Sequence, residues 1–433
     1  MRSGESMRLA GCFLTAFSIL IFGTTVLANH PNEGSLGLEE LIKEASAQNQ
    51  EIKAAKLKME SARAMEKVGR AGYYPEVSVE GGYLTTKFET EKNSGSPVYG
   101  KLEWNLYRGG RDQAQSEIRE VESALANKQY SLSQARVARE VAKLYYEMLF
   151  ILESMSLKEK AIDMNGEQMK LAQAKNRSGF TSSADVIEFE LREATLRSDL
   201  KRLEQERSER SRDIAVVLGR SEPTGDLVVK GHLARLNIKD DRQRVLGLIA
   251  DSNPELVEAA AAKSIAQKEL KVVRSDYFPR LDIEGKYGKL ASEERVYAAN
   301  DNYSAFLKIK IPIFSGFSTS SESTASAIKI QQYEKVYSQK HNSSKAEAEA
   351  LFSKIASIQE RLDLEAKTLS RSEEYYKITL GEYKRGVKNS PDMVGASERL
   401  LEARIRNLEF RKELLHARLG ALALVGESPT NGL

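Results

Sequence analysis

The side chains that most often carry metal or nucleophile chemistry are sparse in this sequence. The four histidines are scattered along the chain, at His30, His232, His341 and His416. None has a carboxylate or cysteine at the spacing of a metal site. The glycine pairs Gly81-Gly82 and Gly109-Gly110 lack the Lys-Ser/Thr ending of a phosphate loop, and no nucleophile elbow is present. We therefore predict no catalytic residue, no metal site and no cofactor.

Two short polar segments carry a different chemistry, that of helix ends. Gly179 and Gly386 stand where a helix is expected to end in a left-handed residue. Ser183 and Ser390 are expected to cap the helix that follows, with Pro391 at its first position. Each segment therefore predicts a tight turn between two helices.

The same two segments bring an acid, a phenol and an ammonium group close together in sequence. Tyr383, Lys388 and Asp392 lie within ten residues, and the earlier segment supplies Asp185. An acid in the first turn of a helix ordinarily complements the helix dipole, which is worth about 0.3–1 kcal/mol. If neighbouring hairpins lie side by side, however, these groups can meet and link the two tips.

An internal duplication positions both segments. Tyr74-Pro75 recurs as Phe278-Pro279, 204 residues later, and Gly179 recurs as Gly386, 207 residues later. The proline ends a helix and begins a strand, because it lacks an N–H and its φ is fixed. Internal similarity at a fixed spacing indicates a repeated structural unit, so the duplication predicts that both halves have the same architecture.

Long helices dominate each predicted half. The chain has 9 prolines and 7% aromatic residues among 433, which is typical of a mainly α protein. Helices from about residue 111 to 175 and from about residue 318 to 383 would each be roughly 100 Å long. An apolar stripe along the first is typical of a coiled-coil seam.

The extended segments alternate between apolar and polar residues. Val77 and Val79 are expected on one face of the first strand, and Glu76, Ser78 and Glu80 on the other. The last strand alternates from Tyr303 to Ile313. Polar turns are expected at residues 91–96 and 298–302. The strands match the ~9–11 residues of a tilted membrane strand, although a half-buried sheet alternates in the same way.

Four strands cannot close a barrel in a membrane, because the smallest membrane barrels use eight and an open edge leaves backbone groups unsatisfied. The chain must therefore oligomerise if it inserts. Two copies give an eight-stranded barrel filled by side chains, so a wide channel needs at least three.

The N-terminus has the pattern of a signal peptide. Arg2 and Arg8 precede an apolar run that ends in Val26-Leu27-Ala28, a small-residue cleavage pattern. A membrane anchor is the alternative. Cleavage would remove Cys12, the one cysteine, so no disulfide is expected. The formal charge of +3 is near balance, which argues against a nucleic-acid partner.

These observations define the predicted segments. The boundaries are residues 1–28 for the signal peptide; 29–220 for the first repeat, with a β-hairpin at about 75–107 and a helical hairpin at about 111–218; 221–243 for a linker; 244–426 for the second repeat, with a β-hairpin at about 279–314 and a helical hairpin at about 318–424; and 427–433 for a tail.

Over nearly the whole chain after residue 28, the sequence resembles the TolC-like outer-membrane efflux protein family. The resemblance rests on the strand starts Tyr74-Pro75 and Phe278-Pro279, the strand ends at residues 106–110 and 313–317, and the two turns. It implies a homotrimer with a 12-stranded barrel, a 12-helix periplasmic tube and no catalysis. It also implies a location in the outer membrane of a Gram-negative bacterium, with contact to its lipid.

The resemblance further implies roles for the turns. Asp392 matches a ring aspartate at the closed periplasmic entrance, and Asp185, Tyr383 and Lys388 match its linking network. A second ring aspartate of the family is Gly395 here. The turns Gly179-Phe180 and Gly386-Val387 match the docking sites of a periplasmic adaptor, through which an inner-membrane transporter is reached.

The function implied is that of a passive exit duct in tripartite efflux or type I secretion. These two are not separated by the sequence, because the inner-membrane transporter selects the cargo. A periplasmic coiled-coil scaffold or adaptor protein without a barrel is the alternative. Adaptors normally carry one helical hairpin between glycine-rich β domains, which this sequence lacks.

Overall fold

The structure is a computed structural model that describes residues 36–88, 91–220, 227, 229–233, 241–289 and 302–429. The predicted signal peptide, most of the predicted linker and residues 298–301 of a predicted turn lie outside the described residues. So do the last four residues of the predicted tail.

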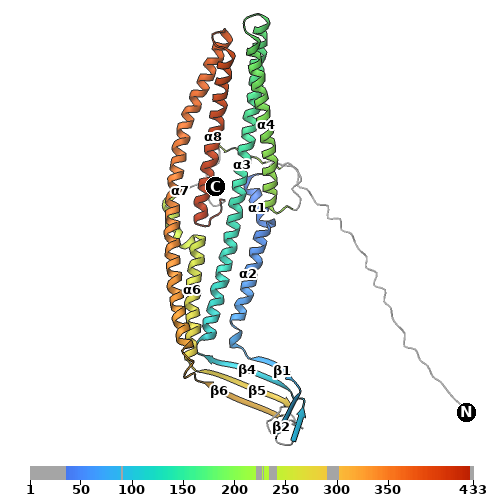
Figure 1. Ribbon diagram of the computed structural model, residues 1–433, viewed down its shortest axis with the longest axis vertical. Helices are drawn as coiled ribbons and strands as arrows, with labels where there is room; N and C mark the ends of the chain where they lie inside the picture. The colour runs from blue at the N-terminus through green and yellow to red at the C-terminus, as the bar shows by residue number, and fades with distance from the viewer. Residues whose placement is uncertain are drawn as a thin grey trace, which may run out of the picture. The chain divides into compact units, whose positions relative to one another are not determined.

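Each half of the chain contributes the same series of helices. The first series is α1 (Leu38–Gln48), α2 (Gln50–Gly69), η1 (Ala71–Tyr73), α3 (Arg111–Arg177) and α4 (Ser183–Leu218). The second is α5 (Arg242–Ser252), α6 (Pro254–Arg274), η3 (Ser275–Tyr277), α7 (Ser318–Arg385) and α8 (Ser390–Leu424). The long helix α3 packs against α4 toward one end of the molecule and against α2 toward the other. In the same way, α7 packs against α8 and α6 (Figure 1).

A buried asparagine starts the second helix of each series. The Asn49 side chain accepts the Ile52 N–H, and that of Asn253 accepts the Leu256 N–H. Each amide also donates to a carbonyl near the end of the last helix in its half, Asn49 to Val217 and Asn253 to Leu424. One side chain thus caps a helix and ties two elements together.

The main sheet has four antiparallel strands in the order β1-β4-β5-β6. These are β1 (Glu76–Gly81), β4 (Val98–Arg108), β5 (Arg280–Lys289) and β6 (Asn302–Lys310). The two hairpins have equivalent registers, since Glu76 lies opposite Glu103 and Arg280 opposite Lys310. The duplication therefore extends to individual residue pairs.

The four strands have one apolar face and one charged face. Val77, Leu102 and Gly285 form one cross-strand row, and Trp104, Ile283 and Leu307 form the next. On the other face Lys101 pairs with Glu80 and Glu103, and Lys286 pairs with Glu284. The apolar face is largely exposed in the single chain, in contrast to an ordinary half-buried sheet.

Three details of the predicted strands are wrong. Residues 91–95, predicted as a turn, form β3 (Glu91–Gly95), which pairs with β2 (Leu84–Phe88) in a separate two-stranded sheet. The last strand ends at Lys310 instead of Ile313, and Pro312 beyond it has no N–H for a ladder. The alternation of β4 predicts Leu106 on the apolar face with Leu102 and Trp104, but a bulge between Asn105 and Tyr107 places Tyr107 opposite Leu281 instead.

The largest hydrophobic core lies where α1 packs on α3 and α4. Tyr146, Met148 and Leu149 of α3 are fully buried there against Leu41 and Leu218. Burial of each such side chain contributes about 1.5–3 kcal/mol. Among the described helices, none has the length and apolar content of a membrane-spanning helix.

Candidate functional site at the helical tips

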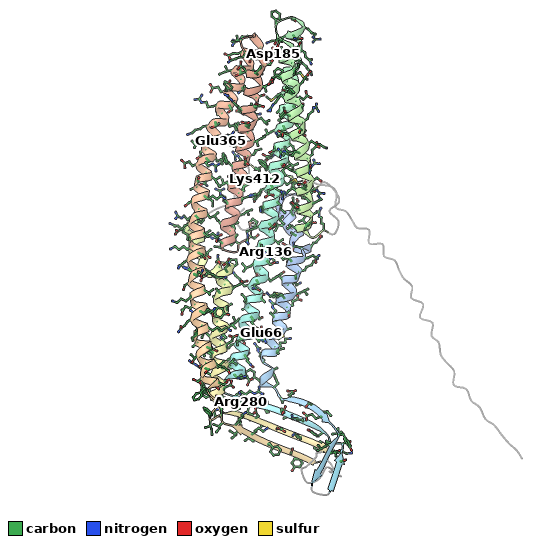
Figure 2. All side chains as sticks on the ribbon, in the orientation of Figure 1. Glu66, Arg136, Asp185, Arg280, Glu365 and Lys412 are labelled. Carbon is green, nitrogen blue, oxygen red and sulfur yellow. The ribbon has the colours of Figure 1, made fainter. Side chains whose placement is uncertain are left out.

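The two predicted turns lie at the ends of the long helical hairpins, at the opposite end from the sheet (Figure 2). Gly179 and Gly386 have φ of 73° and 82°, the left-handed conformation expected of them. The following N–H groups bond back to the helix, Phe180 to Lys175 and Val387 to Glu382. Phe180 is 85% exposed and Val387 is 69% exposed. Each tip therefore presents an apolar side chain to solvent.

The predicted caps are wrong by one residue. Helix α4 begins at Ser183 with Ser182 as its N-cap, and α8 begins at Ser390 with Asn389 as its N-cap. The Asn389 side chain accepts the Asp392 N–H at 3.0 Å. Ser390 is fully buried. Because Asn389 caps the helix, Ser390 is available for contacts with Asp185 of the first hairpin and Tyr383 of its own.

Asp185 joins the start of α4 to the start of α8. Its carboxylate accepts hydrogen bonds from Thr181 Oγ1, from the Ser182 N–H at 3.2 Å and from the Ser390 N–H at 3.4 Å. The hydrogen bond from Thr181, with further ones from Ser390 and Ser182, lowers the pKa of Asp185 below its ordinary value of 3.8. The acid is therefore charged at neutral pH and bound across the gap between the hairpins.

Tyr383 meets the same serine from α7. Its hydroxyl lies 3.4 Å from Ser390 Oγ, and its ring packs edge-on against Phe189 with centroids 6.0 Å apart. Burial raises the pKa of Tyr383, which remains a neutral phenol. Lys175 of α3 lies over the ring, 4.4 Å from its centroid, and donates to the Tyr383 carbonyl. Asp185 and Tyr383 are thus brought together through Ser390.

Lys388 and Asp392 form a second, separate group. Their side chains pair at 3.8 Å from positions four residues apart in sequence, and both are more than a third exposed. Among the described residues, no hydrogen bond or ion pair joins this pair to the side chain of Asp185 or Tyr383 within one chain. Gly395, one turn beyond Asp392, has open space where a Cβ would stand.

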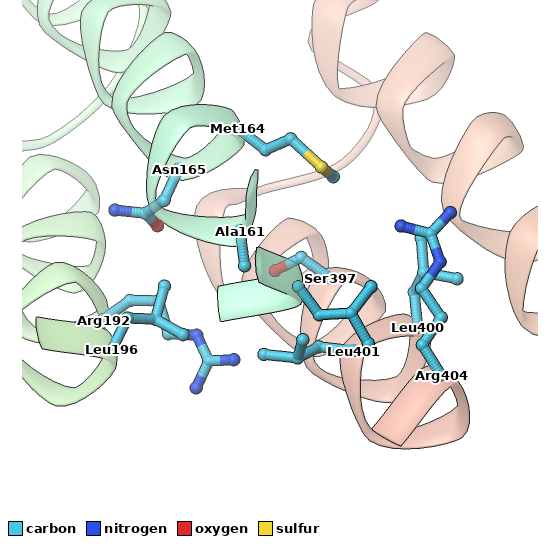
Figure 3. Close-up of a pocket in the computed structure, with 10 residues that line it drawn as sticks. Ala161, Met164, Asn165, Arg192, Leu196, Ser397, Leu400, Leu401 and Arg404 are labelled. Atoms are coloured by element: carbon cyan, nitrogen blue, oxygen red, sulfur yellow. The ribbon is translucent and has the colours of Figure 1, made fainter. Parts of the chain in front are cut away.

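Further links between the hairpins were missed by the sequence analysis. Gln168 of α3 donates to the Tyr376 hydroxyl of α7 at 3.1 Å. Arg192 of α4 donates to Glu398 of α8 at 2.6 Å, although only 12% of the arginine side chain is exposed. Arg192 also lines a small cavity between α3, α4 and α8 (Figure 3). No fixed sequence spacing signals such pairs, because they depend on how two hairpins are rotated about each other.

The two strand starts lie at the other end of the hairpins. Tyr74 and Phe278 are exposed aromatic residues that follow the short helices η1 and η3, and Pro75 and Pro279 precede β1 and β5. Among the described residues no group of three or more His, Cys, Asp or Glu side chains is placed to hold a metal ion. The described residues therefore provide hydrogen bonds and ion pairs between the two hairpins, exposed turns at their tips, and an exposed apolar face on the sheet.

Comparison with known proteins covers both halves of the chain. The family model described as "Outer membrane efflux protein" matches residues 41–220 and 245–427. Protein CyaE of Bordetella pertussis is 22% identical over 83% of this chain and 77% of its own length. The pyoverdine export outer membrane protein OpmQ of Pseudomonas aeruginosa is 19% identical, over 91% and 85%.

Solved structures show the same fold. The outer membrane protein VceC of Vibrio cholerae superimposes with a TM-score of 0.77 over 90% of this chain and 96% of that one, at 14% identity. At this identity the likeness concerns the arrangement of helices and strands.

Proposed function

The chain belongs to the outer membrane efflux protein family, and we propose that it is a protomer of a passive export duct that crosses the outer membrane and the periplasm. Its relatives include an outer membrane protein named for pyoverdine export. The observation that carries this function is the match of both repeats to the family model, joined to a sheet with one exposed apolar face.

We propose that three copies form the duct. Four strands per chain would then supply the 12 strands of a closed barrel, with the apolar face toward outer-membrane lipid and the charged face toward the lumen. A barrel removes the open strand edges that lipid cannot satisfy. The helical hairpins would continue the barrel as a periplasmic tube.

At the tips we propose a closed entrance. Asp185 supports this role because it accepts the Ser390 N–H across the two hairpins of one protomer, and Tyr383 contacts the same serine from within the second hairpin. Asp392 and Lys388 would act between protomers, where three Asp392 carboxylates near the axis would attract cations. Gly395 in place of a second acid would make this cation site weaker.

The partners proposed are a periplasmic adaptor and, through it, an inner-membrane transporter. The exposed turns Gly179-Phe180 and Gly386-Val387 present apolar side chains on matching backbones, which suits one adaptor tip binding both. The transporter would select the cargo, and the duct itself would have no catalytic role.

Reconstitution tests this function. We expect the full chain to fractionate with outer membranes, to require detergent for extraction, and to conduct ions in planar bilayers. A protein that is soluble without detergent and silent in bilayers would instead be a periplasmic scaffold.

A further inference from the structure

We propose that the open edge of β6, together with residues Ile311–Ser318, receives β1 and the end of α2 of a second copy in the register that β4 and β5 use within one chain. Phe317 is the aromatic anchor of this contact. The inference rests on the proposed oligomeric duct and specifies its subunit junction residue by residue.

The junction between the two repeats within one chain serves as the template. There β4 pairs with β5 along its whole length, with Glu103 opposite Glu284. Behind the strands, Gly109 approaches so closely that a Cβ would lie 2.6 Å from the Ser275 carbonyl oxygen and 2.8 Å from Phe278. Arg111 adds an ion pair to Asp276 at 2.7 Å.

The second repeat presents the same surface without a cover. Since β6 corresponds to β4 and β1 to β5, the two sheet edges are the two halves of one more such junction. Gly316, the equivalent of Gly109, has no atom within 4 Å of its Cβ position. Ile313 is 95% exposed and Phe314 is 74% exposed. A head-to-tail contact of this type forms a ring of identical copies where the rotation from one copy to the next closes.

The duplication fixes the register of the missing partner. Transferring the β4–β5 pairs places Lys310 opposite Glu80 of the second copy and Ile311 opposite its Val79. In its own hairpin Lys310 lies opposite Arg280, a like charge. The neighbouring copy would therefore supply the opposite charge that its own chain does not, and opposite charges across strands are stabilising.

Phe317 has a backbone conformation that its residue type rarely adopts. Its φ is 68°, and it is the only positive value outside glycine among the described residues. The equivalent residue of the first repeat is Gly110, with φ of 83°. A bulky residue in this region persists where the surroundings hold it, and such residues cluster at functional contacts. In the single chain Phe317 contacts Phe314 edge-on and is 73% exposed.

The template shows what the Phe317 ring would fill. Beside Gly110 lies a hollow of about 260 Å³ that is lined by the start of α3, by Lys271 and Arg274 at the end of α6, and by Phe278 beyond η3. The corresponding residues at the end of α2 are Lys67, Arg70 and Tyr74. In the junction between copies the ring would occupy this hollow against the aliphatic and cationic parts of those side chains.

An apolar anchor is needed there because the ion pair of the template cannot be repeated. The equivalents of Arg111 and Asp276 are Ser318 and Gly72, which carry no charge. The open junction would thus replace an ion pair by burial of an aromatic ring.

Cysteine crosslinking tests the register. Cross-strand Cα distances of about 4.5–5.5 Å suit a disulfide, and Cys12 in the predicted signal peptide is the one native cysteine. We expect the full-length Lys310→Cys/Glu80→Cys protein in outer membranes to form covalent oligomers on oxidation. The control pair Lys308→Cys/Glu80→Cys, displaced by two residues on the same face, should form few. Crosslinking of the control pair alone in an intact oligomer would overturn the inference and leave the function standing. A monomeric mass would overturn the proposed function.

Substitution of Phe317 tests the anchor. Phe317→Gly relieves the backbone conformation, so a merely strained residue would leave the oligomer as stable as before or more so. We expect instead a downward shift of the temperature at which the detergent-solubilised oligomer dissociates, whereas Phe317→Tyr should stay close to the unsubstituted protein. An unchanged or raised dissociation temperature for Phe317→Gly would rule the anchor out.

Discussion

Asp185 shows how a helix-capping acid can also link two hairpins. One carboxylate oxygen serves the start of its own helix, at Ser182, and the other accepts the Ser390 N–H of α8. Tyr383 approaches the same serine from α7. Single hydrogen bonds of this type contribute only about 0.5–1.5 kcal/mol each, so a binding partner could open the proposed closed entrance.

Removal of both groups should open the entrance. We expect Asp185→Ala with Tyr383→Phe to raise the single-channel conductance in planar bilayers severalfold, because the first change removes the hydrogen bond between the hairpins and the second removes the hydroxyl contact that positions Ser390 for it. Arg192→Lys, which retains the charge facing Glu398, serves as a control with a smaller effect. Unchanged conductance of the double variant in a folded oligomer would leave Asp185 and Tyr383 as structural residues.

The conductance should also depend on pH through Asp185. Its folded-state pKa lies below the ordinary 3.8, so its link contributes fully above that value and is lost as the pH falls through the lowered pKa. We expect conductance attributable to this link to be flat from neutral pH to about 4 and to rise below it. Asp185→Asn should abolish the rise, and an equal rise in that variant would assign the effect to another group.

The residues of the tips could be named from the sequence, but their grouping could not. The repeat and the family resemblance pointed to Asp185, Tyr383, Lys388 and Asp392. The separation into a buried pair around Ser390 and an exposed Lys388–Asp392 pair depends on helix rotation, which a sequence pattern does not specify.

Among the elements, the buried asparagines are the clearest case of one residue doing two tasks. Asn253 caps α6 with its oxygen and binds the Leu424 carbonyl of α8 with its nitrogen. Aspartate retains the capping oxygen but has no N–H to donate. The substitution therefore separates the two tasks.

We expect Asn253→Asp to destabilise the protein by about 1–3 kcal/mol, the cost of an unsatisfied buried carbonyl. Asn253→Ala, which removes both the cap and the donor without burying a charge, should also destabilise the protein by about 1–3 kcal/mol. The midpoint of thermal unfolding, followed by helical circular dichroism in detergent, measures both. An aspartate variant as stable as the native protein would contradict the proposed tie between α6 and α8.

The single tryptophan reports on the sheet. Trp104 lies on the apolar face of β4, is 40% exposed, and donates its indole N–H to the Tyr73 carbonyl at 3.1 Å. We expect brominated lipids to quench its fluorescence strongly and aqueous iodide to quench it weakly. The reverse order would mean that the apolar face does not contact lipid.

Strand faces could be predicted from the sequence because the alternation has a period of two, which assigns each side chain to one face. Strand ends and irregularities could not. The bulge at Leu106 depends on a pairing partner 170 or more residues away in sequence. The early end of β6 before Pro312 depends on a missing backbone N–H, which the apolar–polar alternation does not encode. The long helices were easier, since their period continues over many turns.

On the scale of the whole molecule, the duplication provides equivalent sheet edges at the centre of the chain and at its two ends. The two hairpins of a chain share a register, and the chain exposes at its edges the two surfaces that it joins at its centre. Under the proposed head-to-tail contact, addition of identical copies would extend this junction until the ring closes. In the proposed duct, oligomerisation is therefore the step on which lipid contact, lumen and entrance would all depend.

The mass of the detergent-solubilised protein tests the proposed oligomerisation most directly. With the detergent contribution subtracted by light scattering, we expect the protein mass of three chains, the number that closes a 12-stranded barrel. A protein that is folded, with its helical content intact, yet has the mass of one or two chains would contradict the account.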